Sequence, residues 1–195
     1  MTAHLFVISA PSGAGKTSLL KAVLAQLPDL HVSVSHTTRA IRPGEVDGVN
    51  YHFTDIPTFK ARVAAGEFLE HAEVFGNFYG TSRTTVEQAL AAGKDLVLEI
   101  DWQGARRVRE LFPAAVTIFI APPSIAELQR RLQARGQDSA EVIARRMAAA
   151  EDEMSHAGEY RYHVVNDDFA RATAALAGII KQVRAEGEPP RGPSA

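Results

Sequence analysis

The sequence predicts an α/β protein built on a doubly wound parallel sheet. Short apolar runs, mostly of β-branched residues and leucine, occur at residues 5–8, 96–100, 116–120 and 163–166, and helical patterns separate them. Continuous apolar strands that alternate with helices are typical of a parallel sheet whose two faces are both covered. In such sheets ligands bind beyond the carboxyl ends of the strands, where the loop after the first strand lies.

Length and composition fit one ordinary globular domain that is large enough to carry inserted subdomains. The chain has 195 residues, of which 46% are hydrophobic, and its formal net charge is −2. Acids and bases are interspersed, which gives no bulk electrostatic reason to expect nucleic acid or a membrane as partner. The absence of cysteine excludes a disulfide framework and a thiolate metal site. No apolar run is long enough to cross a bilayer, so we expect a soluble, cytoplasmic protein.

Two segments interrupt the alternation of strands and helices. A first helix is predicted from about residue 15 to 27, followed by a strand at 31–35. Residues 36–84 resemble an α+β insertion, with strand-like pieces at 51–53 and 68–70 around a helical stretch at 56–66. Residues 124–158 are helical by composition, carry five arginines and resemble a mobile lid. The remaining segments are a core at about 1–35, 85–123 and 159–184, with a closing helix at 168–184, and a disordered tail at 185–195.

A glycine-containing turn between the first strand and the first helix indicates phosphate binding. It reads Ala10-Pro11-Ser12-Gly13-Ala14-Gly15-Lys16-Thr17-Ser18, and it matches the pattern G-x-x-x-x-G-K-[ST] except that Ala10 replaces the first glycine. Unpaired backbone N–H groups at a helix N-terminus favour an anion there. Gly13 and Gly15 let the backbone approach the phosphates, Lys16 reaches the β and γ oxygens, and the Thr17 hydroxyl ligates Mg²⁺. The alternative is a glycine-rich turn that holds no ligand.

A strand that ends in acids supplies a second part of such a site. Residues 95–101 read DLVLEID, and in proteins with this loop a carboxylate at the end of a neighbouring strand organises the water shell of Mg²⁺. Either Glu99 or Asp101 is predicted to play that part, while Asp101 can equally cap the helix that begins near Trp102. The seven histidines are scattered without metal-ligand spacing, so none is assigned to a metal.

Two pairs of arginines are candidates for further phosphate contacts. Arg39 and Arg42 lie three residues apart in the insertion, and guanidinium forks match phosphate oxygens bidentately. Arg131 and Arg135 would share one helix face and clamp a polyphosphate. For both pairs the alternative is a solvated surface. Two tyrosines, Tyr51 and Tyr79, are candidate phenolic donors to the phosphate at the first pair. The commoner alternative for each is a half-buried tyrosine of the core.

Taken together, these strings resemble the guanylate kinase family, and most closely its bacterial members. The resemblance spans about residues 5–184 and is carried by the phosphate loop and by motifs at 34–45, 71–81, 99–104, 131–136 and 165–168. The order and spacing of so many motifs make it specific. It implies ATP-dependent phosphorylation of GMP to GDP by an enzyme with a core, a GMP-binding insertion and a lid. We expect Mg²⁺ as the cofactor that accompanies ATP, and we expect dGMP to be accepted too because no residue is assigned to the ribose 2′-OH. Glu99 departs from the family pattern, in which an aspartate is usual.

The resemblance also assigns roles to the matching positions of this chain. It implies that the GMP phosphate is held by Arg39, Arg42, Tyr51 and Tyr79. It implies that guanine is surrounded by Ser35, Glu70, Thr81 and Asp101. The residues implied to stabilise the transferring phosphoryl are Lys16, Arg39, Arg131, Arg135 and Arg146, and the residue implied to lie near adenine is Asn166.

Two other interpretations stay open at the level of the sequence. A related kinase on the same scaffold, such as a ribose bisphosphate kinase, would share the phosphate loop, but Glu70 and Thr81 favour a pocket that recognises a base. The second interpretation is a non-catalytic guanylate-kinase-like binding module. Such modules tend to lose the phosphate loop, whereas its glycines, Lys16 and Thr17 are present here.

Overall fold

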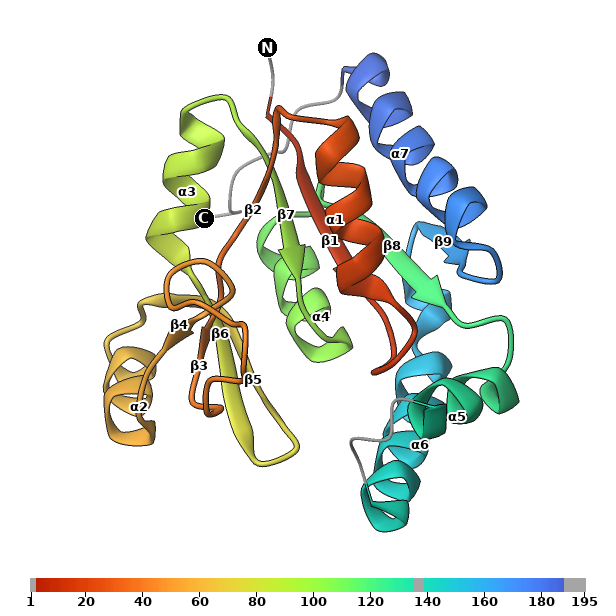
Figure 1. The fold of residues 1–195 in the computed structure, drawn as a ribbon. Coiled ribbons are helices and arrows are strands. Elements are labelled where there is room, and N and C mark those ends of the chain that lie inside the picture. Colours follow the sequence, from red (N-terminus) through yellow and green to blue (C-terminus); the bar gives the residue numbers. More distant parts are fainter. Residues whose placement is uncertain (1–2, 135–138, 188–195) are drawn as a thin grey trace.

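A five-stranded parallel sheet forms the centre of the molecule. The structure, a computed structural model, describes residues 3–134 and 139–187. The strand order is β2-β7-β1-β8-β9, and every pairing in this sheet is parallel. In that order the strands span Leu30–Val32, Asp95–Glu99, Leu5–Ser9, Val116–Ala121 and Tyr162–Val165. Helices cover both faces of the sheet (Figure 1), so the predicted doubly wound α/β fold is confirmed.

The central strand β1 buries residues on both of its faces. Phe6 and Ile8 belong to one apolar cluster, while Leu5 and Val7 belong to another, because alternate residues of a strand point to opposite faces of a sheet. The first cluster includes side chains of the helices α1 (Lys16–Gln26) and α7 (Phe169–Glu186). The second includes side chains of α3 (Arg83–Ala91) and α4 (Trp102–Leu111). This two-sided core fixes the end of β1, where the phosphate loop begins.

A second, four-stranded sheet lies within the segment predicted as an α+β insertion. Its strand order is β4-β3-β6-β5, and the strands span His52–Phe53, His36–Thr37, Asn77–Ser82 and Phe68–Val74. Helix α2 (Ile56–Ala64) packs on it through Phe59, whose ring stacks on that of Phe68 at a centroid distance of 4.6 Å. β5 and β6 form an antiparallel hairpin, and its turn contains Phe75 and Gly76, both with positive φ. The hairpin carries Glu70, Tyr79 and Thr81, and Leu69 of β5 belongs to the second apolar cluster of the core.

The arginine-rich segment folds as two helices, α5 (Ile125–Ala134) and α6 (Ala140–Ser155), which pack together through Leu128, Leu132 and Ala150. A short 3-10 helix, η1 (Ala157–Glu159), follows. At the end of the described chain, α7 continues to Glu186, so residues 185 and 186 are helical and do not belong to the predicted tail. The rest of that predicted tail, 188–195, lies outside the described residues. None of the described helices combines the length and the apolar character that spanning a membrane requires.

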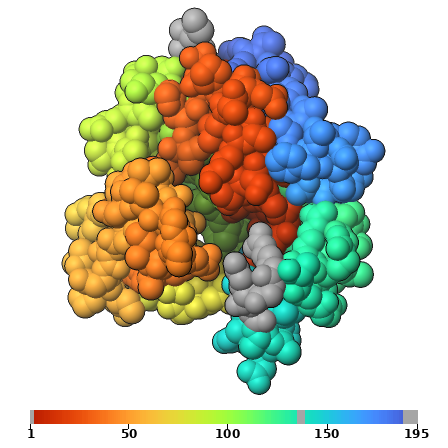
Figure 2. Space-filling view, in the orientation of Figure 1, coloured from red at the N-terminus to blue at the C-terminus, as the bar shows by residue number. Residues whose placement is uncertain are grey.

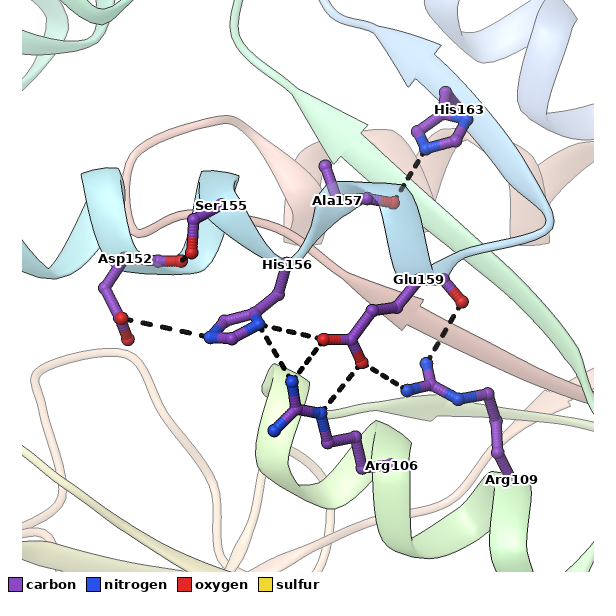
Figure 3. A network of polar contacts seen from close by, with 8 residues as sticks. All are labelled: Arg106, Arg109, Asp152, Ser155, His156, Ala157, Glu159 and His163. Carbon is purple, nitrogen blue, oxygen red and sulfur yellow. Dashed lines mark hydrogen bonds and ion pairs between the residues drawn. The ribbon is translucent and has the colours of Figure 1, made fainter.

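A polar network anchors the C-terminal end of α6 on α4 (Figure 3). Glu159 accepts hydrogen bonds from Arg106 and Arg109, one of them 2.9 Å long from Arg106 Nε to Glu159 Oε2. Hydrogen bonds from Arg106 foremost, and then from His156 and Arg109, lower the pKa of Glu159 to about 2. The ring of His156 stacks on that of Trp102 at a centroid distance of 3.8 Å, and its Nδ1 lies 2.9 Å from Glu159 Oε1. Helix α6 is therefore held at one end, next to the central sheet.

Candidate active site

The loop between β1 and α1 has the geometry of an anion site. Gly13 and Gly15 have φ angles of 94° and 93°, in the left-handed region that favours glycine. A Cβ on Gly15 would lie 2.4 Å from Asn166 Nδ2, so space also requires a glycine there. Asn166 Nδ2 donates to the carbonyl of Ala14 at 2.6 Å, which holds the loop in place. Helix α1 begins directly after Gly15, and the N–H groups of its first turn favour an anion.

Thr17 and Glu99 meet beside this loop. Thr17 Oγ1 donates to Glu99 Oε1 at 2.7 Å, and the Lys16 ammonium lies 4.0 Å from the same carboxylate oxygen. Asp101 instead caps α4, because its Oδ1 accepts from the N–H of Gly104 at 2.9 Å. The described residues contain no cluster of three acidic, histidine or cysteine side chains that would hold a metal alone. A hydroxyl and one carboxylate fit Mg²⁺, which binds proteins through few side chains and takes its other ligands from water and phosphate.

A cavity of about 480 Å³ lies in front of the loop and extends to the second sheet. Figure 2 shows a hollow in this face of the molecule, between the orange part of the insertion and the red N-terminal segment, with green residues at its floor. All predicted loop residues from Ala10 to Ser18 line the cavity except Ala14. The other predicted residues that line it are Ser35, Arg39, Arg42, Tyr51, Glu70, Tyr79, Glu99, Asp101 and Arg146.

Other predicted residues do not line the cavity. Ala14 is buried within the loop, and Asn166 packs against it. Thr81 is fully buried and donates its hydroxyl hydrogen bond to Glu70 Oε1. Arg131 donates from Nη2 to the carbonyl of Asn166 and from Nε to Glu127, both at 2.9 Å, so protein groups already engage its guanidinium. The predicted residue Arg135 lies outside the described residues.

Glu45 organises the arginine pair of the insertion. Its Oε1 lies 2.7 Å from Arg39 Nη2, and its Oε2 accepts from the backbone N–H of Arg42 at 2.8 Å. The Arg39 guanidinium also lies over the Tyr51 ring, 5.4 Å from its centroid. Burial, with Glu99 and Tyr79 nearby, raises the pKa of Tyr51 to about 12, so its phenol keeps its proton and remains a donor. Two arginines and two tyrosines of the insertion thus line the same cavity as the loop.

Glu70 and Thr81 form a buried polar pair in the β5–β6 hairpin. The Glu70 side chain is buried, and burial is the main cause that raises the pKa of its carboxyl to about 7, with a smaller contribution from Asp101. Gly104 leaves the space that this carboxyl occupies, because a Cβ there would lie 2.5 Å from Glu70 Oε2. A carboxylate that faces a cavity with a buried hydroxyl behind it accepts paired N–H donors, such as those of a planar base.

Two acidic residues of the site were not predicted from the sequence. Glu45 follows Arg42 by three residues, and that spacing is the signal that could have indicated its contact with the pair. Glu153 lines the cavity from α6. It lies on one helix face with Arg146 and Ala150, at the spacing i, i+4, i+7, and this periodicity could have placed it beside the predicted arginine.

The fold and the site define a P-loop nucleotide-binding protein: a glycine-containing loop at the carboxyl end of a parallel sheet, with arginines and tyrosines of the insertion lining the same cavity. The family model described as guanylate kinase matches residues 2–183. The chain therefore belongs to the guanylate kinase family, and the resemblance seen in its motifs is confirmed.

Curated relatives and a solved structure agree with this assignment. A guanylate kinase from Alkalilimnicola ehrlichii is 62% identical over 180 residues, which cover 92% of this chain and 89% of that protein. One from Shewanella denitrificans is 59% identical over 178 residues, covering 91% of this chain and 86% of that protein. The crystal structure of guanylate kinase from Anaplasma phagocytophilum matches with a TM-score of 0.76 at 37% identity, covering 93% of this chain and 86% of that one.

Proposed function

We propose that this chain transfers the γ-phosphoryl group of ATP to GMP, giving ADP and GDP, and that it accepts dGMP as well. The relatives named guanylate kinase support this activity. The observation that carries it is that the phosphate loop, the arginine pair and the buried Glu70 line one shared cavity. An ATP-dependent reaction and a chain without cysteine fit the cytoplasm as the place where it occurs.

The donor phosphates would bind at the loop. Backbone N–H groups at the start of α1 cradle them, and Lys16 is within reach of the β and γ oxygens. Mg²⁺ bound with ATP would neutralise charge on those oxygens, and Thr17 and Glu99 rather than the helix-capping Asp101 are the residues that would hold it. Asn166, fixed on the loop, is the proposed neighbour of the adenine.

The acceptor would bind at the opposite end of the cavity. The GMP phosphate would be held by the arginine pair with Tyr51 and Tyr79, because forked N–H groups match its oxygens. Guanine presents N–H donors at N1 and N2 beside the O6 acceptor. Glu70 can accept both donors when it is ionised, and a hydroxyl such as that of Ser35 can donate to O6. Because none of these residues is assigned to the ribose 2′-OH, dGMP should be accepted too.

Transfer would then need no nucleophile from the protein. An oxygen of the GMP phosphate attacks the γ-phosphorus in line as ADP leaves, and the protein contributes positioning and charge stabilisation. Lys16 and Arg146, which both line the cavity, neutralise the charge of the transferring group. We propose the same role for Arg39, Arg131 and Arg135, of which Arg131 would have to leave its present partners.

The architecture supports separate roles for three parts of the chain. We propose a core of about 1–35, 85–123 and 159–184, a GMP-binding insertion at 36–84 and a lid at 124–158. The four-stranded sheet falls within the second range, and α5 and α6 fall within the third. Closure of the insertion and the lid over the core would bring both phosphates together and exclude water.

A coupled assay of ADP release across GMP, dGMP, AMP, CMP and UMP, with ribose 1,5-bisphosphate as a further acceptor, tests this function. We expect turnover with GMP and dGMP and little with the others. Preferred turnover of the ribose bisphosphate would show that the chain is a different kinase on the same scaffold. Absence of turnover with every acceptor, in a folded protein that binds nucleotides, would support a non-catalytic binding module.

A further inference from the structure

Glu153 brings an unexpected negative group to the phosphate loop. It lies on α6, and its carboxyl lines the same cavity as Ser12 and Lys16. Figure 1 shows the C-terminal half of α6 below the loop that joins β1 to α1. The Oε2 atom of Glu153 is buried and has no hydrogen-bond partner among the residues that the structure describes. A buried carboxylate oxygen without a partner thus belongs to a residue that lines the cavity beside a loop suited to binding anions.

The groups around this carboxyl act in opposite directions on its charge. Burial raises its pKa to about 7, against the Lys16 ammonium and the backbone N–H of Ser12, which lower it. Asp101, at the start of α4, and Asp152, its neighbour on α6, raise it further. The same ammonium and loop N–H groups are those that the proposed function assigns to the donor phosphates. An ionised Glu153 and a triphosphate therefore compete for the same positive groups.

We propose that Glu153 is a positioning residue that opposes the donor phosphates: its carboxylate interacts with the phosphate loop in the unliganded protein, and ATP binds when that carboxyl is protonated or withdrawn. This inference rests on the proposed function, since it takes ATP as the ligand of the loop. Withdrawal of the carboxyl requires movement of its side chain or of helix α6, whereas protonation requires neither. It also makes ATP affinity depend on pH near neutrality.

Binding of ATP with Mg²⁺ in the absence of GMP, measured by titration calorimetry at pH 6 and pH 8, tests the inference. The full chain is compared with Glu153→Gln and with Glu151→Gln, which removes an exposed carboxylate from the same helix. At pH 6, where Glu153 is mostly protonated, Glu153→Gln and the parent should bind ATP alike. At pH 8, where it is mostly ionised, Glu153→Gln should bind ATP more tightly, by up to about tenfold. Glu151→Gln should match the parent at both values.

The result that would overturn the inference is an affinity of Glu153→Gln for ATP at pH 8 that equals or falls below that of the parent. Glu153→Ala, which removes the acceptor atoms together with the charge, should show the same gain at pH 8. The readout is binding, so it is separate from the proposed reaction. A parent that binds ATP with this pH dependence but does not phosphorylate GMP would contradict the proposed function and support the inference.

Discussion

Replacing Glu70 by glutamine is the sharpest perturbation of base recognition that the structure offers. The change keeps the size of the side chain, and the hydroxyl of Thr81 can still donate to the amide oxygen that replaces Glu70 Oε1. It turns the other oxygen, Oε2, into an N–H₂ group that would face an N–H of guanine. A donor then faces a donor in a buried site.

The expected loss follows from the burial of this side chain. A buried hydrogen-bonding group left without a partner costs about 1–3 kcal/mol, and more when the lost partner is charged. Taking about 3 kcal/mol, kcat/KM for GMP should fall roughly 10²-fold in Glu70→Gln. Stability should not fall with it. The folded protein keeps a proton on Glu70 up to about pH 7, whereas an unfolded chain loses it near 4.5.

The sign of the stability effect follows from that difference. Below pH 4.5 the Glu70 carboxyl is protonated in both states, and its contribution to the free energy of unfolding is fully present. As pH rises through about 7, the free energy of unfolding falls by about 3 kcal/mol, because the unfolded chain releases this proton more readily than the folded protein. Glu70→Gln, which never ionises, should therefore have a Tm at pH 8 that equals or exceeds that of the parent. This measurement separates lost recognition from unfolding.

Initial rates of ADP release with varied GMP and saturating ATP measure the effect. The control is Glu73→Gln, which removes an exposed carboxylate from the same strand and should leave kcat/KM unchanged. In the parent, kcat/KM for GMP should decline as pH falls below about 7, because protonation removes the acceptor that guanine needs. Parent-like use of GMP by Glu70→Gln would refute this placement of the base and give the carboxyl a structural role.

Three further predictions concern the loop, the glycine beside Glu70, and closure. Lys16→Met should lower kcat roughly 10²–10³-fold while the fold is kept, because a positioned cation stabilises the transferring phosphoryl. The control is Lys21→Met, which removes an exposed lysine from the same helix. A near-parental kcat in Lys16→Met would show that the loop does not take part in catalysis. Gly104→Ala should raise KM for GMP about tenfold and leave ATP affinity nearly unchanged, because the new Cβ would displace the Glu70 carboxyl. An unchanged KM would mean that this carboxyl does not contact GMP. Small-angle scattering should show a smaller radius of gyration with GMP and a non-hydrolysable ATP analogue bound, whereas an unchanged radius in the confirmed complex would indicate a site that is already closed.

The parts of the fold that the sequence predicted are those with strong local signals. The runs at 5–8, 96–100 and 116–120 are apolar, short and bounded by breakers, and each is a strand of the central sheet. β6 was missed because its sequence, NFYGTS, is polar and contains a glycine. Its position depends on pairing with β5 and on a turn at Phe75 that no periodicity reveals. The tail was predicted to begin two residues too early, because α7 ends only at the left-handed Gly187.

The candidate site shows the same limit at the level of single side chains. The loop could be predicted because its chemistry lies in consecutive residues. The choice between Glu99 and Asp101 could not, since it depends on which carboxylate reaches Thr17 and which one caps a helix. Glu153 was missed because its partners, Ser12 and Lys16, are far away in the sequence. Such roles depend on how separate elements pack together, and a local sequence pattern does not predict that packing.

The central claim is that donor and acceptor phosphates meet in one cavity. A bisubstrate analogue, with adenosine and guanosine joined through their 5′ positions by a chain of five phosphates, tests it most directly. If the claim is right, the analogue binds one molecule per chain, inhibits competitively against both ATP and GMP, and binds Glu70→Gln more weakly than the parent. Competition against ATP alone, or non-competitive inhibition against both nucleotides, would show that the two phosphates do not meet in this cavity.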